Sequence, residues 1–122
     1  MIPKVLLIED DTTMLTLLRT LLDYEGYEVA QMEGDGELNA IVESIRKEKP
    51  SLILLDVHLR QVNGFELFQL IRKHEDLQEI RVIMTSGMDF DQRCQNEGVD
   101  GFIQKPYMPE ELIRKIRELS GG

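Results

Sequence analysis

Charged and hydroxyl-bearing residues directly follow four short apolar runs of this 122-residue chain. They are the triplet Glu9-Asp10-Asp11 after 5–8, Asp56 after 52–55, Thr85-Ser86 after 81–84, and Lys105 after 101–104. Carboxylates that lie together repel one another unless a positive charge joins them, and Mg²⁺ prefers oxygen ligands of this kind. A carboxylate beside Mg²⁺ can attack phosphorus and form an acyl phosphate, so this pattern predicts phosphoryl transfer.

Asp56 is the expected nucleophile, because it ends the apolar run Leu52–Leu55 and its position is therefore well defined. Mg²⁺, the ammonium of Lys105 and the hydroxyl of Thr85 would supply three contacts to the phosphoryl oxygens. Each residue taken alone also has an ordinary explanation as a solvated charge, a turn residue or a helix cap. Their joint occurrence after four separate runs favours the chemical interpretation.

Five apolar runs, which alternate with five amphipathic stretches, must position these residues. The predicted strands are 5–8, 27–32, 52–55, 81–84 and 101–104, and the predicted helices lie around 14–22, 38–45, 65–71, 90–97 and 109–119. Nearly continuous apolar runs are typical of strands with helices on both faces. Strict alternation predicts an α/β, doubly wound (βα)5 three-layer sandwich with a five-stranded parallel sheet, in which ligands bind beyond the carboxyl ends of the strands.

The composition excludes several classes of protein. Fourteen basic residues against 23 acidic ones give a net charge of −9, which argues against direct nucleic acid binding. Cys94 is the single cysteine, so neither an internal disulfide nor a cysteine-based zinc cluster can form, and a cytoplasmic location is expected. The apolar run near the amino terminus is too short for a signal sequence or a membrane span, so no membrane insertion is expected.

Five segments of the sequence resemble the receiver domain of two-component response regulators, from Lys4 to about Leu119. They are Leu6–Asp11, Leu54–Leu59, Asn63–Leu67, Met84–Gly87 and Gly98–Pro106. Any one of them is a weak signal, whereas all five in this order and spacing are a strong one. The resemblance implies a single receiver domain over 1–122, with its core at 4–119, and the flavodoxin-like strand order 2-1-3-4-5.

The resemblance also implies a role for each site residue. Asp56 matches the phosphoacceptor, and Mg²⁺ is the implied cofactor. Asp10 matches a direct metal ligand and Glu9 a ligand acting through water, although the alternative pair Asp10-Asp11 stays open. The main-chain carbonyl of His58 falls at the third metal-ligand position of the family.

Three further residues match the part of the family that responds to phosphorylation. Thr85 matches the switch hydroxyl, Phe102 the switch aromatic, and Lys105 the lysine that contacts the phosphate, joined to Pro106 by a cis peptide. The sequence departs from the family pattern at Arg60, where proline is usual, and at Phe102, where tyrosine is commoner.

The function implied is that of a phosphorylation-operated signalling switch, a regulatory domain and not an enzyme beyond its own phosphorylation and dephosphorylation. A histidine kinase or histidine phosphotransfer protein would donate the phosphoryl group. The reader would be a downstream protein, a fused output domain, or a second copy in a homodimer. The surface read would be the face of the fourth helix, fifth strand and fifth helix, around 90–107.

Other functions remain alternatives. A phosphatase-type enzyme with an aspartyl-phosphate intermediate would want a second aspartate where His58 stands. A flavodoxin-like cofactor binder would not place Glu9-Asp10-Asp11 against a phosphate. A receiver that serves as a docking scaffold without being phosphorylated would not need the complete set of site residues.

Overall fold

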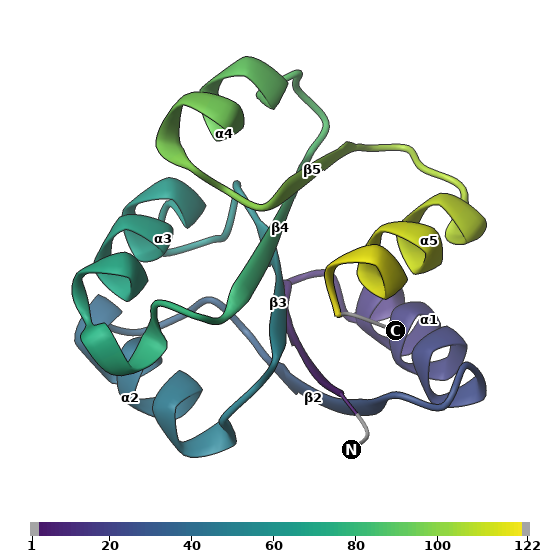
Figure 1. Cartoon of the computed structure of the whole chain (residues 1–122), viewed down its shortest axis with the longest axis horizontal. Helices are drawn as coiled ribbons and strands as arrows, with labels where there is room; N and C mark the ends of the chain where they lie inside the picture. Colours follow the sequence, from purple (N-terminus) through teal and green to yellow (C-terminus); the bar gives the residue numbers. More distant parts are fainter. Residues whose placement is uncertain (1–2, 121–122) are drawn as a thin grey trace.

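Five strands and five α-helices alternate along the chain in the computed structural model, which describes residues 3–120 (Figure 1). The strands are β1 (Lys4–Ile8), β2 (Glu28–Met32), β3 (Leu52–Asp56), β4 (Arg81–Ser86) and β5 (Gly101–Gln104). The helices are α1 (Thr12–Tyr24), α2 (Leu38–Glu48), α3 (Gly64–Lys73), α4 (Asp91–Glu97) and α5 (Pro109–Leu119), with a 3₁₀ turn, η1, at Glu75–Leu77. No helix within residues 3–120 has the length and apolar character needed to cross a membrane.

The strands form one parallel sheet in the order β2-β1-β3-β4-β5, which confirms the predicted fold. In Figure 1, α1 and α5 cover one face of this sheet, and α2, α3 and α4 cover the other. Side chains of β1 alternate between the two faces: Leu6 and Ile8 pack toward α2–α4, and Val5 and Leu7 pack toward α1 and α5. The inner strands are apolar at almost every position because both of their faces are buried.

Two predicted strands proved too short at their carboxyl ends. Asp56 is the last residue of β3, and Thr85 and Ser86 are the last two residues of β4. The apolar pattern stops one or two residues early there because these polar side chains occupy strand positions at the rim of the sheet. The predicted second strand is one residue too long, since β2 begins at Glu28 and not at position 27.

Helix α1 begins two residues before the apolar pattern predicted, because its start is set by a cap. The side chain of Asp11 accepts a hydrogen bond from the N–H of Met14 at 3.1 Å. Asn63 caps α3 in the same way, accepting from the N–H of Phe65 at 2.8 Å. Both caps hold a helix start at the carboxyl-end rim of the sheet.

Candidate functional site

The residues that follow the strands meet at one rim of the sheet, as the strand-end rule predicts. Asp56 and Thr85 are directly paired in register between β3 and β4. A polar depression of about 520 Å³ lies at this rim, lined by Glu9, Asp10, Asp11, Thr12, Asp56, His58, Leu59, Arg60 and Lys105. The structure therefore brings together residues that are up to 96 positions apart in the sequence.

Lys105 is placed between two buried carboxylates. Its Nζ lies 2.9 Å from Glu9 Oε1 and 3.1 Å from Asp56 Oδ2, and both acids are only 7 % exposed. The Lys105 N–H donates to the carbonyl of Ser86 at 2.8 Å, and a cis peptide joins Lys105 to Pro106, as the resemblance implied. Burial alone would lower the pKa of Lys105, but the hydrogen bond to Glu9 and the negative charge of Asp56 outweigh it and raise that pKa.

Glu9 carries a carboxylate that burial penalises. Its Oε2 accepts hydrogen bonds from the N–H groups of Asp10, at 2.9 Å, and Asp11, at 3.2 Å. Burial raises the pKa of Glu9; the hydrogen bond from Lys105 opposes this shift, and the charge of Asp56 adds to it. The single ammonium of Lys105 thus pairs with two carboxylates, so Lys105, Glu9 and Asp56 together carry an excess of negative charge.

Asp56 is fixed by contacts with His58 and with Gly64, the first residue of α3. Its Oδ1 accepts the N–H of His58 at 3.1 Å. A Cβ placed on Gly64 would lie 2.6 Å from the carbonyl oxygen of Asp56, so a larger residue at position 64 would displace the phosphoacceptor's backbone. The exposed side chain of His58 has its ring 5.9 Å from the ring of Phe90, at the start of α4.

Asp10 has a different environment from Glu9. One of its oxygens, Oδ1, accepts the N–H of Gly34 at 2.9 Å, and Oδ2 accepts the N–H of Arg60. These donors lie on the connections after β2 and β3, and sequence patterns gave no signal for either contact. Asp11, the alternative acid of the predicted pair, is exposed and serves as the cap of α1.

The two predicted switch residues lie beside the site on β4 and β5. Thr85 is 3 % exposed, and its carbonyl accepts the N–H of Val57 at 2.9 Å. Phe102 is partly buried, pairs in register with Met84, and packs against the core on the α2–α4 side. Thr85 itself pairs in register with Ile103, the residue that follows Phe102 on β5.

The donor set fits Mg²⁺ in its chemistry, because carboxylates and a main-chain carbonyl are the oxygen ligands that a hard cation prefers. Within residues 3–120, however, no three His, Cys, Asp or Glu side chains are gathered closely enough to hold a metal ion. The ammonium of Lys105 lies between Glu9 and Asp56, and the oxygens of Asp10 are engaged with two loops.

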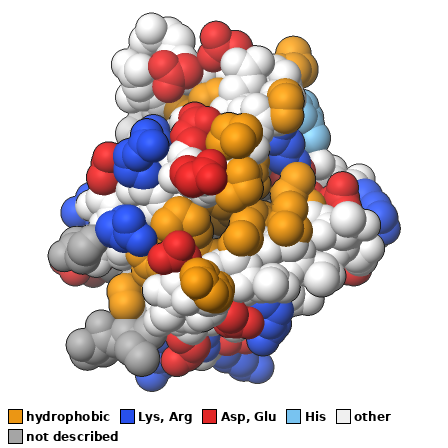
Figure 2. Space-filling view, turned by 90° about the vertical axis from the view of Figure 1, so that its right-hand side faces the viewer, with side chains coloured by type: hydrophobic (Ala, Val, Ile, Leu, Met, Phe, Trp, Pro, Cys, Tyr) orange, Lys and Arg blue, Asp and Glu red, His pale blue; other side chains and the backbone are white. Residues whose placement is uncertain are grey.

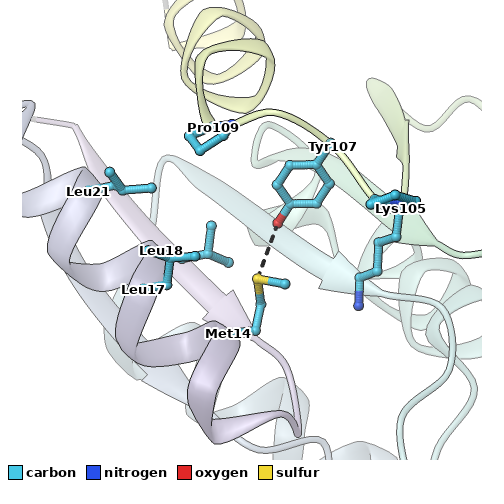
Figure 3. A pocket seen from close by; sticks show the side chains of 8 residues that line it. Met14, Leu17, Leu18, Leu21, Lys105, Tyr107 and Pro109 are labelled. Carbon is cyan, nitrogen blue, oxygen red and sulfur yellow. Dashed lines mark hydrogen bonds between the residues drawn. The ribbon is translucent and has the colours of Figure 1, made fainter.

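An apolar groove of about 390 Å³ lies next to the polar depression, between α1 and the start of α5. It is lined by Met14, Leu17, Leu18, Leu21, Lys105, Pro106, Tyr107 and Pro109. Figure 2 shows a band of hydrophobic side chains on this face of the molecule, and Figure 3 shows the Tyr107 hydroxyl reaching the sulfur of Met14, 3.8 Å away. Burial raises the pKa of Tyr107 to about 12.

Several relatives of the chain are named as transcriptional regulators and are about twice its length. The alkaline phosphatase synthesis transcriptional regulatory protein PhoP of Bacillus subtilis is 31% identical over 120 residues, covering 95% of this chain and 48% of that protein. The probable transcriptional regulator ycf27 of Porphyra purpurea is 34% identical over 117 residues, covering 95% of this chain and 46% of that protein. The chain spans about half the length of these curated relatives.

Solved structures show the same fold. The N-terminal domain of the nisin resistance regulator NsrR has a TM-score of 0.81 at 30% identity, covering 97% of both chains. The receiver domain of a sensor histidine kinase from Pseudomonas aeruginosa, which holds a magnesium ion in its active site cleft, has a TM-score of 0.83 at 23% identity, covering 100% of both chains. The family model for the response regulator receiver domain matches residues 5–117. The chain therefore belongs to the response regulator receiver domain family of two-component signal transduction.

Proposed function

We propose that Asp56 accepts a phosphoryl group from a phosphohistidine of a histidine kinase or histidine phosphotransfer protein, in a reaction that depends on Mg²⁺. The observation that carries this proposal is the position of Lys105 Nζ, which lies 2.9 Å from Glu9, just after β1, and 3.1 Å from Asp56, at the end of β3, both buried. A buried group of two acids and one lysine has surplus negative charge, which a divalent cation can neutralise before the phosphoryl group arrives.

In the reaction, a carboxylate oxygen of Asp56 forms a bond to phosphorus while the bond from phosphorus to the donor nitrogen breaks. Asp10, Asp56 and the main-chain carbonyl of His58 would hold Mg²⁺ directly, with Glu9 acting through water. Mg²⁺, when bound, supplies charge neutralisation to the transferring group. Before phosphorylation the ammonium of Lys105 is shared between Glu9 and Asp56. After phosphorylation it pairs with the phosphoryl oxygens on Asp56.

The switch follows from the neighbours of Asp56. The hydroxyl of Thr85, in register with Asp56 on β4, turns toward the new phosphoryl group, and Phe102 rotates inward from its partly buried position. The surface that changes is the face of α4, β5 and α5, which a downstream protein, a fused output domain or a second copy of the chain reads. Such a local charge event that biases a two-state element is how modifications generally act.

The apolar groove between α1 and α5 is the proposed docking surface for the phosphodonor protein. The donor must present its phosphohistidine to Asp56, so its surface must adjoin the depression, and the groove shares Lys105 with that depression. Leu17, 49 % exposed on α1, is available for such contact. Leu17→Glu should slow phosphotransfer from a histidine kinase that phosphorylates the wild type, and leave phosphorylation by acetyl phosphate unchanged.

The decisive experiment is the intact mass of the protein after incubation with acetyl phosphate and Mg²⁺. Wild type should gain one phosphoryl group that is labile in base, and Asp56→Asn should gain none. A label mapped to His58 or to a serine would disprove the proposal. Lys105→Ala provides the second arm: it should bind Mg²⁺ nearly as well as wild type but be phosphorylated slowly or fail to switch.

A further inference from the structure

The main-chain N–H of Arg60 holds the carboxylate of Asp10, and we propose that this contact is a latch which Mg²⁺ must release. The inference rests on the proposed function, in which Asp10 is a direct metal ligand. Both oxygens of Asp10 accept main-chain N–H groups, from Gly34 and Arg60. Asp10 is therefore committed to two loops, while Glu9 and Asp56 share Lys105.

The two loops that Asp10 joins are also packed against each other. Gly34 lies 24 residues after Asp10, on the connection from β2 to α2, and Arg60 lies 50 residues after it, on the connection from β3 to α3. Gly34 packs closely against Leu59, the residue before Arg60: a Cβ placed on Gly34 would lie 2.4 Å from Leu59 Cδ1. The carboxylate of Asp10, itself only 8 % exposed, thus fastens the loop of Asp56 to the loop after β2.

Burial decides which of the two contacts gives way. Gly34 is buried, so its N–H would lose its acceptor with no water to replace it, and an unsatisfied buried donor is costly. Arg60 is exposed and its bond to Asp10 is only partly buried, so water can replace this acceptor at a lower cost than at Gly34. The bond from Arg60 is therefore the one that opens when Asp10 turns to a cation.

Opening this bond has two consequences. The hydrogen bond from Arg60 stabilises the carboxylate of Asp10 in its metal-free position. Because this bond must break before Asp10 can bind Mg²⁺, the latch lowers the apparent affinity of the protein for Mg²⁺. Arg60 also lies two residues after His58, whose carbonyl is the third proposed ligand, so release of Arg60 frees the segment that must approach the metal. The geometry thus assigns Arg60 as a positioning residue that links metal binding to the loop of Asp56.

The test compares two variants at one position. Arg60→Ala removes the side-chain charge and keeps the N–H, and Arg60→Pro removes the charge and the N–H together. By calorimetry, Arg60→Pro should bind Mg²⁺ about three- to tenfold more tightly than Arg60→Ala, the effect of one lost hydrogen bond to a carboxylate. Equal or weaker binding by Arg60→Pro would overturn the latch.

A second measurement on the wild-type protein does not depend on the proline variant folding. During a Mg²⁺ titration followed by NMR, the amide proton of Arg60 should move upfield as it loses its carboxylate acceptor, while that of Gly34 should move little. An Arg60 amide that stays in place while Mg²⁺ binds overturns the latch and leaves the metal site standing. Failure of the wild type to bind Mg²⁺ overturns the proposed metal site itself.

Discussion

Two charged groups at opposite ends of the strands show what separates a structural ion cluster from a chemical one. The amino-end cluster is Asp100, just before β5, with Arg72 of α3 and Arg81 of β4. The carboxyl-end cluster is Lys105 with Glu9 and Asp56. One carboxylate meets two cations in the first, whereas two carboxylates meet one cation in the second.

The amino-end cluster is closed, in the sense that additional hydrogen bonds within the protein satisfy its carboxylate and one of its arginines. Asp100 Oδ2 accepts the N–H of Val82 at 2.7 Å and lies 2.8 Å from Arg72 Nη2, while Arg72 Nη1 donates to the carbonyl of Ile80 at 2.8 Å. The carboxylate of Asp100 is thus paired with donors that the protein itself supplies. The carboxyl-end cluster has a surplus of negative charge, and burial raises the pKa of Glu9, so the proposed Mg²⁺ would supply the positive charge that this cluster lacks.

The largest expected effect comes from breaking the closed cluster. Asp100→Ala should lower the free energy of unfolding by roughly 2–3 kcal/mol, because it leaves Arg72 Nη2 and the N–H of Val82 without their acceptor. Urea denaturation measures this change. Arg81→Ala is the matched control: its contact to Asp100 is 3.4 Å long and its side chain is 58 % exposed, so it should cost less than about 0.5 kcal/mol.

Phosphorylation by acetyl phosphate should survive Asp100→Ala wherever the variant is folded. Loss of phosphorylation in folded Asp100→Ala protein would show that the two clusters are not independent.

The opposite sign is expected at the carboxyl-end cluster. Asp56→Asn should raise the free energy of unfolding by about 1 kcal/mol in buffer with a chelator, because it removes repulsion with Glu9 while keeping an oxygen for the N–H of His58. Asp35→Asn is the control, since it removes the same charge from an exposed position. A variant Asp56→Asn less stable than wild type would mean that Lys105 already balances this cluster.

The sequence predicted the convergence of the site better than its internal geometry. Strand alternation places Asp56 and Lys105 on one rim because all parallel strands end on the same side, a property that apolar patterning reveals. The acidic triplet divides in a way that no pattern indicated: Glu9 contacts Lys105, Asp10 contacts two loops, and Asp11 caps α1. That division depends on main-chain N–H groups of distant loops, whose positions are set by tertiary packing.

The smallest expected effect is a pH dependence that Lys105 contributes. Its pKa is raised above its ordinary value of 10.5, so the folded protein holds this proton more tightly than the unfolded chain does. The resulting stability is fully present below 10.5 and is lost as pH rises through the higher pKa of the folded state. Wild type should therefore lose more unfolding free energy between pH 9 and pH 11 than Lys105→Met, as measured by urea denaturation at each pH.

Comparison of these two proteins also removes the contribution of Lys4, whose pKa is raised by its hydrogen bond to Glu48. Lys4 is present in both proteins and begins β1, at the opposite end of that strand from Glu9, the partner of Lys105. An equal loss of stability in wild type and Lys105→Met would mean that the carboxylates hold the ammonium no more tightly than water does. The carboxyl-end cluster would then be less strongly paired than its 2.9 Å and 3.1 Å contacts indicate.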